Sequence, residues 1–191
     1  MLLAFIPLPA KPAPPLGTGI TAVAILGDSI VGGMTPYQSG LTPPINGAAN
    51  LGVGGQTSVQ IAARASSALG YSHVLIEGGI NDFILDYPNP PGNSIVNAYA
   101  QMLQLLSPTV QVRVIGISHV DPGALGSGYT FLNNAAIDAV NNQLINLCAT
   151  FANCLPVIPA MRQDVTGLTV DGIHKSAAGY AAWAPLLAAG L

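Results

Sequence analysis

Charged side chains are scarce in this sequence. They make up 7% of the 191 residues, with five lysine and arginine residues against eight aspartate and glutamate residues. The basic residues lie far apart in the chain, at Lys11, Arg64, Arg113, Arg162 and Lys175. Because nucleic acids and anionic membrane surfaces are bound by clustered basic side chains, we expect neither as a partner.

Long apolar runs are also missing, although half of the residues are hydrophobic. No stretch approaches the roughly 20 residues that a membrane-spanning helix needs. Instead, 22 glycine and 16 proline residues interrupt the apolar runs. The sequence therefore predicts no membrane span and a single compact domain rich in loops, since a chain of this length is too short for two ordinary domains.

Cysteine is rare, and the two that occur are Cys148 and Cys154. They could form a disulfide that closes a short loop, or they could be two buried thiols, and their spacing does not decide between these alternatives. A metal site is disfavoured because no histidine lies near them. The cellular location is not assigned, although the low charge and a disulfide at this position would favour an extracellular one.

The first 18 residues differ in composition from the remainder. An apolar start, Met1 to Ala10, lacks a basic leading segment and runs directly into KPAPPLG. We therefore interpret residues 1–18 as an extended proline-rich arm or linker rather than a cleaved signal peptide, and residues 19–191 as the folded domain.

Apolar runs and helical patterns alternate along residues 19–191. The predicted strands are the runs Ile20–Leu26, Ala48–Val53, Val74–Glu77, Val110–Ile117 and Leu155–Ile158. Helical spacing occurs between them, in a segment that Ser58 caps and Gly70 stops, from Asn93 or Ser94 to Leu106, over Asn133–Phe151, and over Ser176–Leu187. We expect the last helix to bend or restart at Pro185.

This alternation is typical of a parallel sheet covered by helices on both faces. It predicts a three-layer α/β/α sandwich with a five-stranded, flavodoxin-like sheet of strand order 2-1-3-4-5. In such folds, ligands bind beyond the carboxyl ends of the strands. The loops after the strands are therefore where chemistry is expected.

Ser29 lies in the first of these loops, in the string GDS directly after an apolar strand. A serine hydroxyl needs a neighbouring base to become a good nucleophile, so the string alone is more typical of a turn or a helix cap than of a catalytic serine.

A base follows the last predicted strand, where the chain reads Asp171-Gly172-Ile173-His174 before the final helix. The carboxylate can reach back to accept the Nδ1 proton of the imidazole, which leaves Nε2 free to accept the serine proton. Neither of the other two histidines has a carboxylate placed in this way: His73 starts a strand, and His119 follows the fourth strand, where it could line the site or face solvent.

Hydrogen-bond donors for an oxyanion are available in the loops that follow the second and third predicted strands. Gly55 ends NLGVGG just before a helix, so its amide can point at an anion with no side chain in the way. Asn81 in GIND follows the third strand and carries a side-chain amide. Each residue taken singly is equally typical of a turn.

Four strings, GDS, NLGVGG, GIND and DGIH, occur in this order and resemble blocks I, II, III and V of the SGNH (GDSL) hydrolase family. The resemblance spans about Ile20 to Ala184. It implies that Ser29 is the nucleophile, that the Ser29 amide, Gly55 and Asn81 form an oxyanion hole, and that His174 is a base oriented by Asp171. Lys175 stands where the family commonly has a proline.

No cofactor or metal is expected. The string around Ser29, GDSIV, lacks the G-x-S-x-G elbow of ordinary α/β-hydrolases. No glycine-rich string carries the lysine of a P-loop, and no cluster of histidines and carboxylates has metal-ligand spacing. The sequence thus predicts cofactor-free ester hydrolysis through an acyl-enzyme, with an ester as the small-molecule or glycan substrate.

The segments between the motifs are short and predict a preference for short acyl groups, acetyl above all, with a carbohydrate as the alcohol. Candidate substrate-binding residues in the loops are Tyr37, Phe83, Tyr87, His119, Tyr129 and Phe131. Two alternatives stay open, a catalytically silent carbohydrate-binding or structural module and an acyltransferase that uses the same residues. The sequence does not indicate the oligomeric state.

Overall fold

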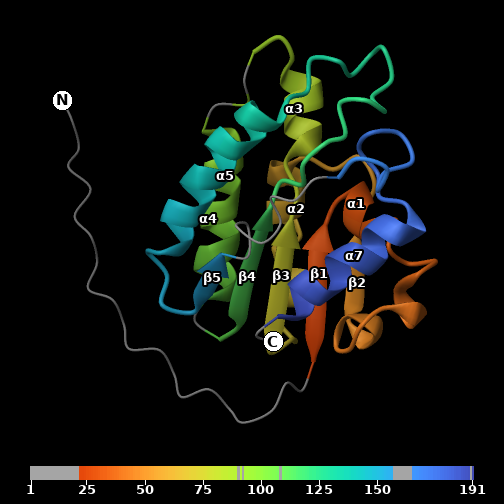
Figure 1. Ribbon diagram of the computed structural model, residues 1–191. Coiled ribbons are helices and arrows are strands. Elements are labelled where there is room, and N and C mark those ends of the chain that lie inside the picture. Colours follow the sequence, from red (N-terminus) through yellow and green to blue (C-terminus); the bar gives the residue numbers. More distant parts are fainter. Residues whose placement is uncertain (1–21, 90, 92, 108, 157–164, 190) are drawn as a thin grey trace, which may run out of the picture.

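A five-stranded, all-parallel sheet forms the centre of the fold (Figure 1). The computed structural model describes residues 22–191 except 90, 92, 108, 157–164 and 190. The strands are β1 (Val23–Gly27), β2 (Ala49–Gly52), β3 (His73–Glu77), β4 (Gln111–Gly116) and β5 (Cys154–Pro156), in the order β2-β1-β3-β4-β5. The predicted strand order is therefore confirmed, whereas the predicted arm over residues 1–18 lies outside the described residues.

Burial explains why the central strands are continuous apolar runs rather than alternating ones. Every residue of β1 is buried, as are all residues of β3 and β4 except the first. Strands covered by helices on both faces have no solvent side on which polar residues could alternate. By contrast, the edge strand β2 is only half-buried along its length, which accounts for its weaker apolar pattern.

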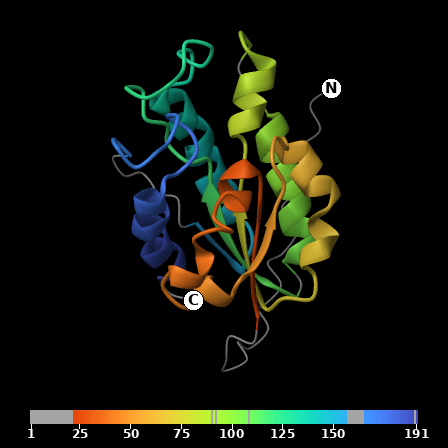
Figure 2. The ribbon, with the colours of Figure 1, turned by 90° about the vertical axis from the view of Figure 1, so that its right-hand side faces the viewer.

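Helices cover both faces of this sheet (Figure 2). On one side, α2 (Ser58–Ala63) contacts α4 (Ser94–Leu106), which in turn contacts α5 (Asn134–Cys148). On the other side lies α7 (Ala177–Ala188), so that the sheet separates α7 from α2 and α4. Two short helices, α1 (Ser29–Gly32) and α3 (Ile80–Asp86), begin just beyond the ends of β1 and β3. The described residues also include three 3-10 turns: Gln38–Gly40, Ile45–Gly47 and Ala65–Ala68.

Three local predictions are corrected by the structure. Thr57, not Ser58, caps α2 through a reciprocal capping box with Gln60. The Ser58 hydroxyl instead donates a hydrogen bond to Asp82. The helix ends at Ala63, and a 3-10 turn replaces its predicted last turns.

Helix α7 also differs from prediction, because it runs without interruption through Pro185. Its buried side chains, which include Trp183 and Leu187 on either side of the proline, hold it against the sheet. That packing outweighs the hydrogen bond lost at the proline.

Cys148 and Cys154 form a disulfide that ties the end of α5 to the start of β5. Of the alternatives left open by the sequence, the disulfide is therefore the one adopted. Within the described parts of the chain, no helix is both long and apolar enough to cross a membrane.

Candidate active site

Ser29 begins α1 immediately after the carboxyl end of β1. The residue before it, Asp28, is the N-cap of that helix, and its Oδ1 accepts a hydrogen bond from the Ile30 amide at 2.9 Å. This cap fixes the turn between strand and helix, so the serine side chain is presented above the sheet.

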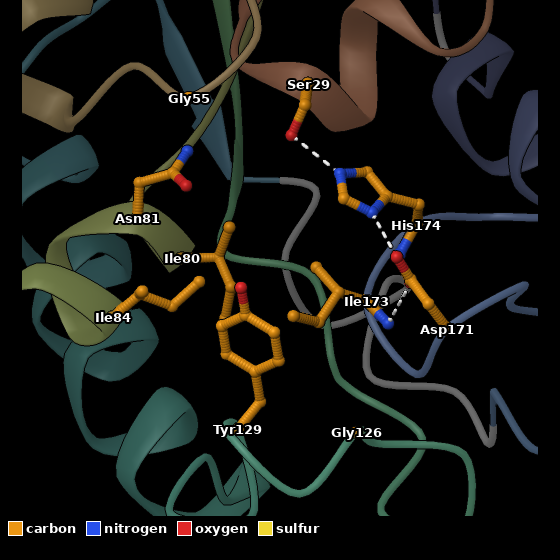
Figure 3. Close-up of a pocket in the computed structure, with 10 residues that line it drawn as sticks. All are labelled: Ser29, Gly55, Ile80, Asn81, Ile84, Gly126, Tyr129, Asp171, Ile173 and His174. Carbon is orange, nitrogen blue, oxygen red and sulfur yellow. Dashed lines mark hydrogen bonds and ion pairs between the residues drawn. The ribbon is translucent and has the colours of Figure 1, made fainter.

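Ser29, His174 and Asp171 form a continuous hydrogen-bonded chain (Figure 3). The Ser29 Oγ lies 2.9 Å from His174 Nε2, and His174 Nδ1 lies 2.7 Å from Asp171 Oδ2. A carboxylate can only accept, so the Nδ1 position carries the proton and Nε2 is free to accept from the serine hydroxyl. The geometry is the one a general base needs to deprotonate a hydroxyl.

Asp171 is held in place by its own turn. Its Oδ1 accepts from the backbone amides of Ile173 at 3.0 Å and His174 at 2.7 Å. Partial burial acts to raise the pKa of this carboxyl, but the hydrogen bonds from the His174 side chain and the two amides outweigh it and lower the pKa. The carboxylate therefore stays ionised opposite the imidazole.

The glycine-rich loop after β2 lies against Ser29. A Cβ added at Gly54 would be 3.9 Å from the Ser29 Cβ, so the two backbones are neighbours. Gly55 has a φ of +76°, a left-handed conformation that favours glycine. The loop thus passes close to the serine, and Gly55 adds no side chain there (Figure 3).

Asn81 lies in the first turn of α3, whereas the sequence predicted a loop at this position. Its Nδ2 donates to the Gln56 carbonyl oxygen at 2.9 Å and to Asp28 Oδ2 at 3.3 Å. The next residue, Asp82, accepts from the amide and the hydroxyl of Ser58 at 2.8 and 2.6 Å, and so ties α3 to α2. The segments that carry Gly55 and Asn81 are therefore fixed to each other and to the turn that carries Ser29.

A cavity of about 320 Å³ opens beside these residues. It is lined by Ser29, Gly55, Ile80, Asn81, Ile84, Gly126, Tyr129, Asp171, Ile173 and His174. Three isoleucines and Tyr129 make the wall away from the serine apolar (Figure 3). The spacing of Ile80 and Ile84, one helical turn apart, could have indicated this wall had α3 been recognised as a helix.

Of the six candidate substrate-binding residues, Tyr129 lines the cavity. Tyr87 and Phe131 stack on each other with ring centroids 4.0 Å apart, and Tyr37 stacks on Tyr180 at 5.6 Å. Phe83 packs against the hydrophobic core, and the His119 Nε2 lies 3.0 Å from Asp138 Oδ1. These five residues are outside the cavity lining, where packing or pairing accounts for their positions.

Within the residues that the structure describes, no group of three or more histidine, cysteine, aspartate or glutamate residues could hold a metal ion. The expectation of a cofactor-free site stays a prediction.

Comparisons with known proteins agree with this fold. Residues 25–182 match the family model described as the GDSL-like lipase/acylhydrolase family, whereas no curated protein matches the chain significantly. Among solved structures, a protein from Bacteroides fragilis proposed as an acylhydrolase is 20% identical, with a TM-score of 0.72 over 92% of this chain and 88% of its own.

Two further solved structures share the fold at lower identity. The lipase/acylhydrolase from Enterococcus faecalis is 19% identical, with a TM-score of 0.67 over 87% of this chain and 92% of its own. The acetylxylan esterase Axe2 from Geobacillus stearothermophilus is 15% identical, with a TM-score of 0.63 over 90% and 94%. Because the family model covers most of the chain, from within β1 to within α7, this protein belongs to the GDSL-like lipase/acylhydrolase family.

Proposed function

We propose that this protein is a serine ester hydrolase that works through an acyl-enzyme, with Ser29 as nucleophile, His174 as general base and Asp171 as its orienting carboxylate. The observation that carries the proposal is the hydrogen-bonded chain from Ser29 Oγ through the imidazole to Asp171 Oδ2, with distances of 2.9 and 2.7 Å. It places a hydroxyl, a base and an acceptor in the order that acyl transfer requires.

In the first half of the cycle, Ser29 Oγ bonds to the ester carbonyl carbon while its proton moves to His174 Nε2. The carbonyl electron pair moves onto its oxygen. When that pair returns, the bond to the alcohol oxygen breaks and His174 gives its proton to the departing alkoxide. Water then attacks the acyl-enzyme in the same manner, with His174 again accepting and returning one proton.

Negative charge develops on the ester carbonyl oxygen when Ser29 attacks, and three hydrogen-bond donors near Ser29 can stabilise it. We assign this role to the Ser29 and Gly55 amides and the Asn81 side chain, since all three residues line the cavity (Figure 3). Donors fixed before the reaction stabilise the transition state without reorganisation.

The apolar wall of Ile80, Ile84, Ile173 and Tyr129 suits the acyl group, and the cavity is small for a ligand pocket. This supports short acyl chains, with acetyl as the first candidate. A carbohydrate alcohol is the second part of the proposal, supported by the fold shared with an acetylxylan esterase. A silent binding module has no need of a base hydrogen-bonded to a serine, so the geometry favours catalysis; transfer to a sugar in place of water would use the same residues.

The test is a set of esters of one alcohol with acetyl, butanoyl, octanoyl and longer acyl groups, assayed on the wild type and on Ser29→Ala. We expect activity only in the wild type, with the highest kcat/KM on the shortest chains. Equal activity in Ser29→Ala would remove the nucleophile assignment, and a preference for long chains would remove the short-acyl assignment. Acetate release from an acetylated glycan then tests the carbohydrate part on its own.

A further inference from the structure

Two carboxyl groups are buried side by side directly beneath Ser29. Asp28 and Glu77 are both fully shielded from solvent. A Cβ added at Gly27 would lie 3.2 Å from Glu77 Oε2, so the Glu77 carboxyl sits against the backbone just before the nucleophile turn. The two side chains are within hydrogen-bonding range of each other.

Glu77 is poorly supplied with donors in this position. Among the described residues, neither of its carboxylate oxygens has a hydrogen-bond partner of good geometry, and the one donor that acts to lower its pKa is the Asp28 backbone amide. The Asp28 side chain is also an acceptor when ionised, so the two carboxyl groups can bond only if one of them carries a proton. A buried carboxylate with so few donors is strongly disfavoured, which selects the protonated form for one member of the pair.

The surroundings decide which member holds the proton. Burial, followed by the charge of Asp28, raises the pKa of Glu77 well above its usual value, and the charge of Lys175 only partly opposes this. Asp28 is also raised by burial, but the Ile30 amide and the hydrogen bond with Glu77 act to lower its pKa. Glu77 is thus the better proton holder. Three other ionisable groups act on the pair, namely Lys175 on Glu77, and His174 and Asp82 on Asp28. The charges of the pair in turn raise the pKa values of Tyr99 and Tyr180.

Lys175 is the cation of this buried set. It is 6% exposed, and its Nζ lies 4.9 Å from the centre of the Trp183 ring. Its charge acts on Glu77 and lowers the pKa of that carboxyl, but less strongly than burial and the Asp28 charge raise it.

Asp28 connects the pair to the candidate oxyanion hole. Its Oδ2 accepts from Asn81 Nδ2 at 3.3 Å, while the other hydrogen of that amide goes to the Gln56 carbonyl at 2.9 Å. An amide nitrogen has two hydrogens, so the longer and weaker bond to Asp28 is the one that an oxyanion can draw away.

We propose that Glu77 is protonated in the resting protein, that its carboxyl donates a hydrogen bond to Asp28, and that Glu77 is thereby a positioning residue for the oxyanion donor Asn81. This rests on the function proposed above. An unshared charge on Asp28 would hold the Asn81 hydrogen and repel an oxyanion formed nearby. A hydrogen bond from Glu77 spreads that charge, so that Asp28 orients the amide without retaining its hydrogen.

A double-mutant cycle separates this role from a merely structural one. Glu77→Gln keeps a donor toward Asp28 and should stay within about 3-fold of wild-type kcat, whereas Glu77→Leu removes it and should lower kcat by about 10-fold with KM nearly unchanged. In the Asn81→Ala background, the same Glu77→Leu change should alter kcat by less than about 2-fold, because its route to the reaction has been removed. Additive losses in the cycle would overturn the proposal. So would a 10-fold loss in a folded Glu77→Gln protein, whatever Glu77→Leu does.

The proton itself can be observed without any activity. Infrared spectra of Ser29→Ala near neutral pH should show a protonated carboxyl band that is missing from Ser29→Ala/Glu77→Gln. Absence of the band from the first protein would overturn the proposal even if the enzyme is an active esterase. A band that disappears as expected, together with no esterase activity in the wild type, would instead contradict the proposed function and leave the carboxyl pair established.

Discussion

Two layers of ionisable residues lie one above the other at the end of β1. The upper layer, Ser29, His174 and Asp171, is open to solvent, with 40% of the His174 side chain and 50% of the Asp171 side chain exposed. The lower layer, Asp28 and Glu77 with Lys175, is almost fully buried. The carboxyl groups in the two layers are chemically alike, yet their pKa values move in opposite directions.

The difference comes from the donors that each carboxyl receives. Asp171 accepts from an imidazole and two backbone amides, which outweigh its partial burial and lower its pKa. Glu77 is fully buried and faces another carboxyl, so its pKa is raised. Asp171 therefore remains charged because donors surround it, whereas Glu77 can hold a proton because it faces a second acceptor.

The largest effect is expected from Asp171→Asn, which should lower kcat by roughly 10⁴-fold because the imidazole would then be held in the wrong tautomer. KM should change little. Asp138→Asn is a matched control, since Asp138 also accepts from a histidine, His119, at 3.0 Å but lies outside the cavity lining. Steady-state kinetics on an acetyl ester measure both. Similar losses in the two variants would mean that the upper layer has no special role.

A second change concerns Asn81, whose side-chain amide donates to Asp28 in the lower layer and lines the cavity with Ser29. Asn81→Ala should lower kcat by roughly 10²-fold with little change in KM, because its amide acts on charge that develops only in the transition state. Asn97→Ala, on the exposed side of α4, should have no effect. An Asn81→Ala enzyme within a few-fold of wild type would leave Asn81 as a turn residue.

The buried layer should make stability depend on pH in a defined direction. The Glu77 pKa is higher in the folded state than in the unfolded chain, so its favourable contribution is present below the unfolded value and is lost as pH rises through the folded one. Glu77→Gln removes that loss. Relative to wild type, the free energy of unfolding of Glu77→Gln should rise with pH by at most about 1.4 kcal/mol per pH unit between about pH 5 and pH 7.5. Urea unfolding at each pH measures this difference. A constant difference would mean that Glu77 is ionised in both states.

Asp171 should show the opposite and smaller trend. Its pKa is lowered by folding, so its contribution is present above the unfolded value and is lost as pH falls through the folded one. Because half of its side chain is exposed, solvent screens this contribution. In Asp171→Asn, the decline in stability below about pH 4 should be slightly shallower than in the wild type. A steeper decline would reverse the assignment of its ionised state.

Much of the fold and of the upper layer could be predicted from the sequence. Buried strands give apolar runs, and four strings at their carboxyl ends carry the residues that the fold brings together. A hydroxyl, an imidazole and a carboxylate three residues before it suffice to predict the chain of hydrogen bonds. Asn81 lines the same cavity as Ser29, but its setting in α3 was missed because a seven-residue helix has too few turns to show a period.

The lower layer and the cavity were decided by tertiary structure alone. Glu77 ends a strand like many other residues, and nothing local indicates that it faces Asp28 or that Lys175 enters the same buried space from 98 positions further along the chain. Likewise, Ile84, Gly126 and Ile173 line one cavity only because α3 and two loops meet there. The sequence by itself determined which groups could react, since reactivity follows from residue type and local spacing. The packing of distant segments determined their protonation and the room beside them, because burial and charge act through space.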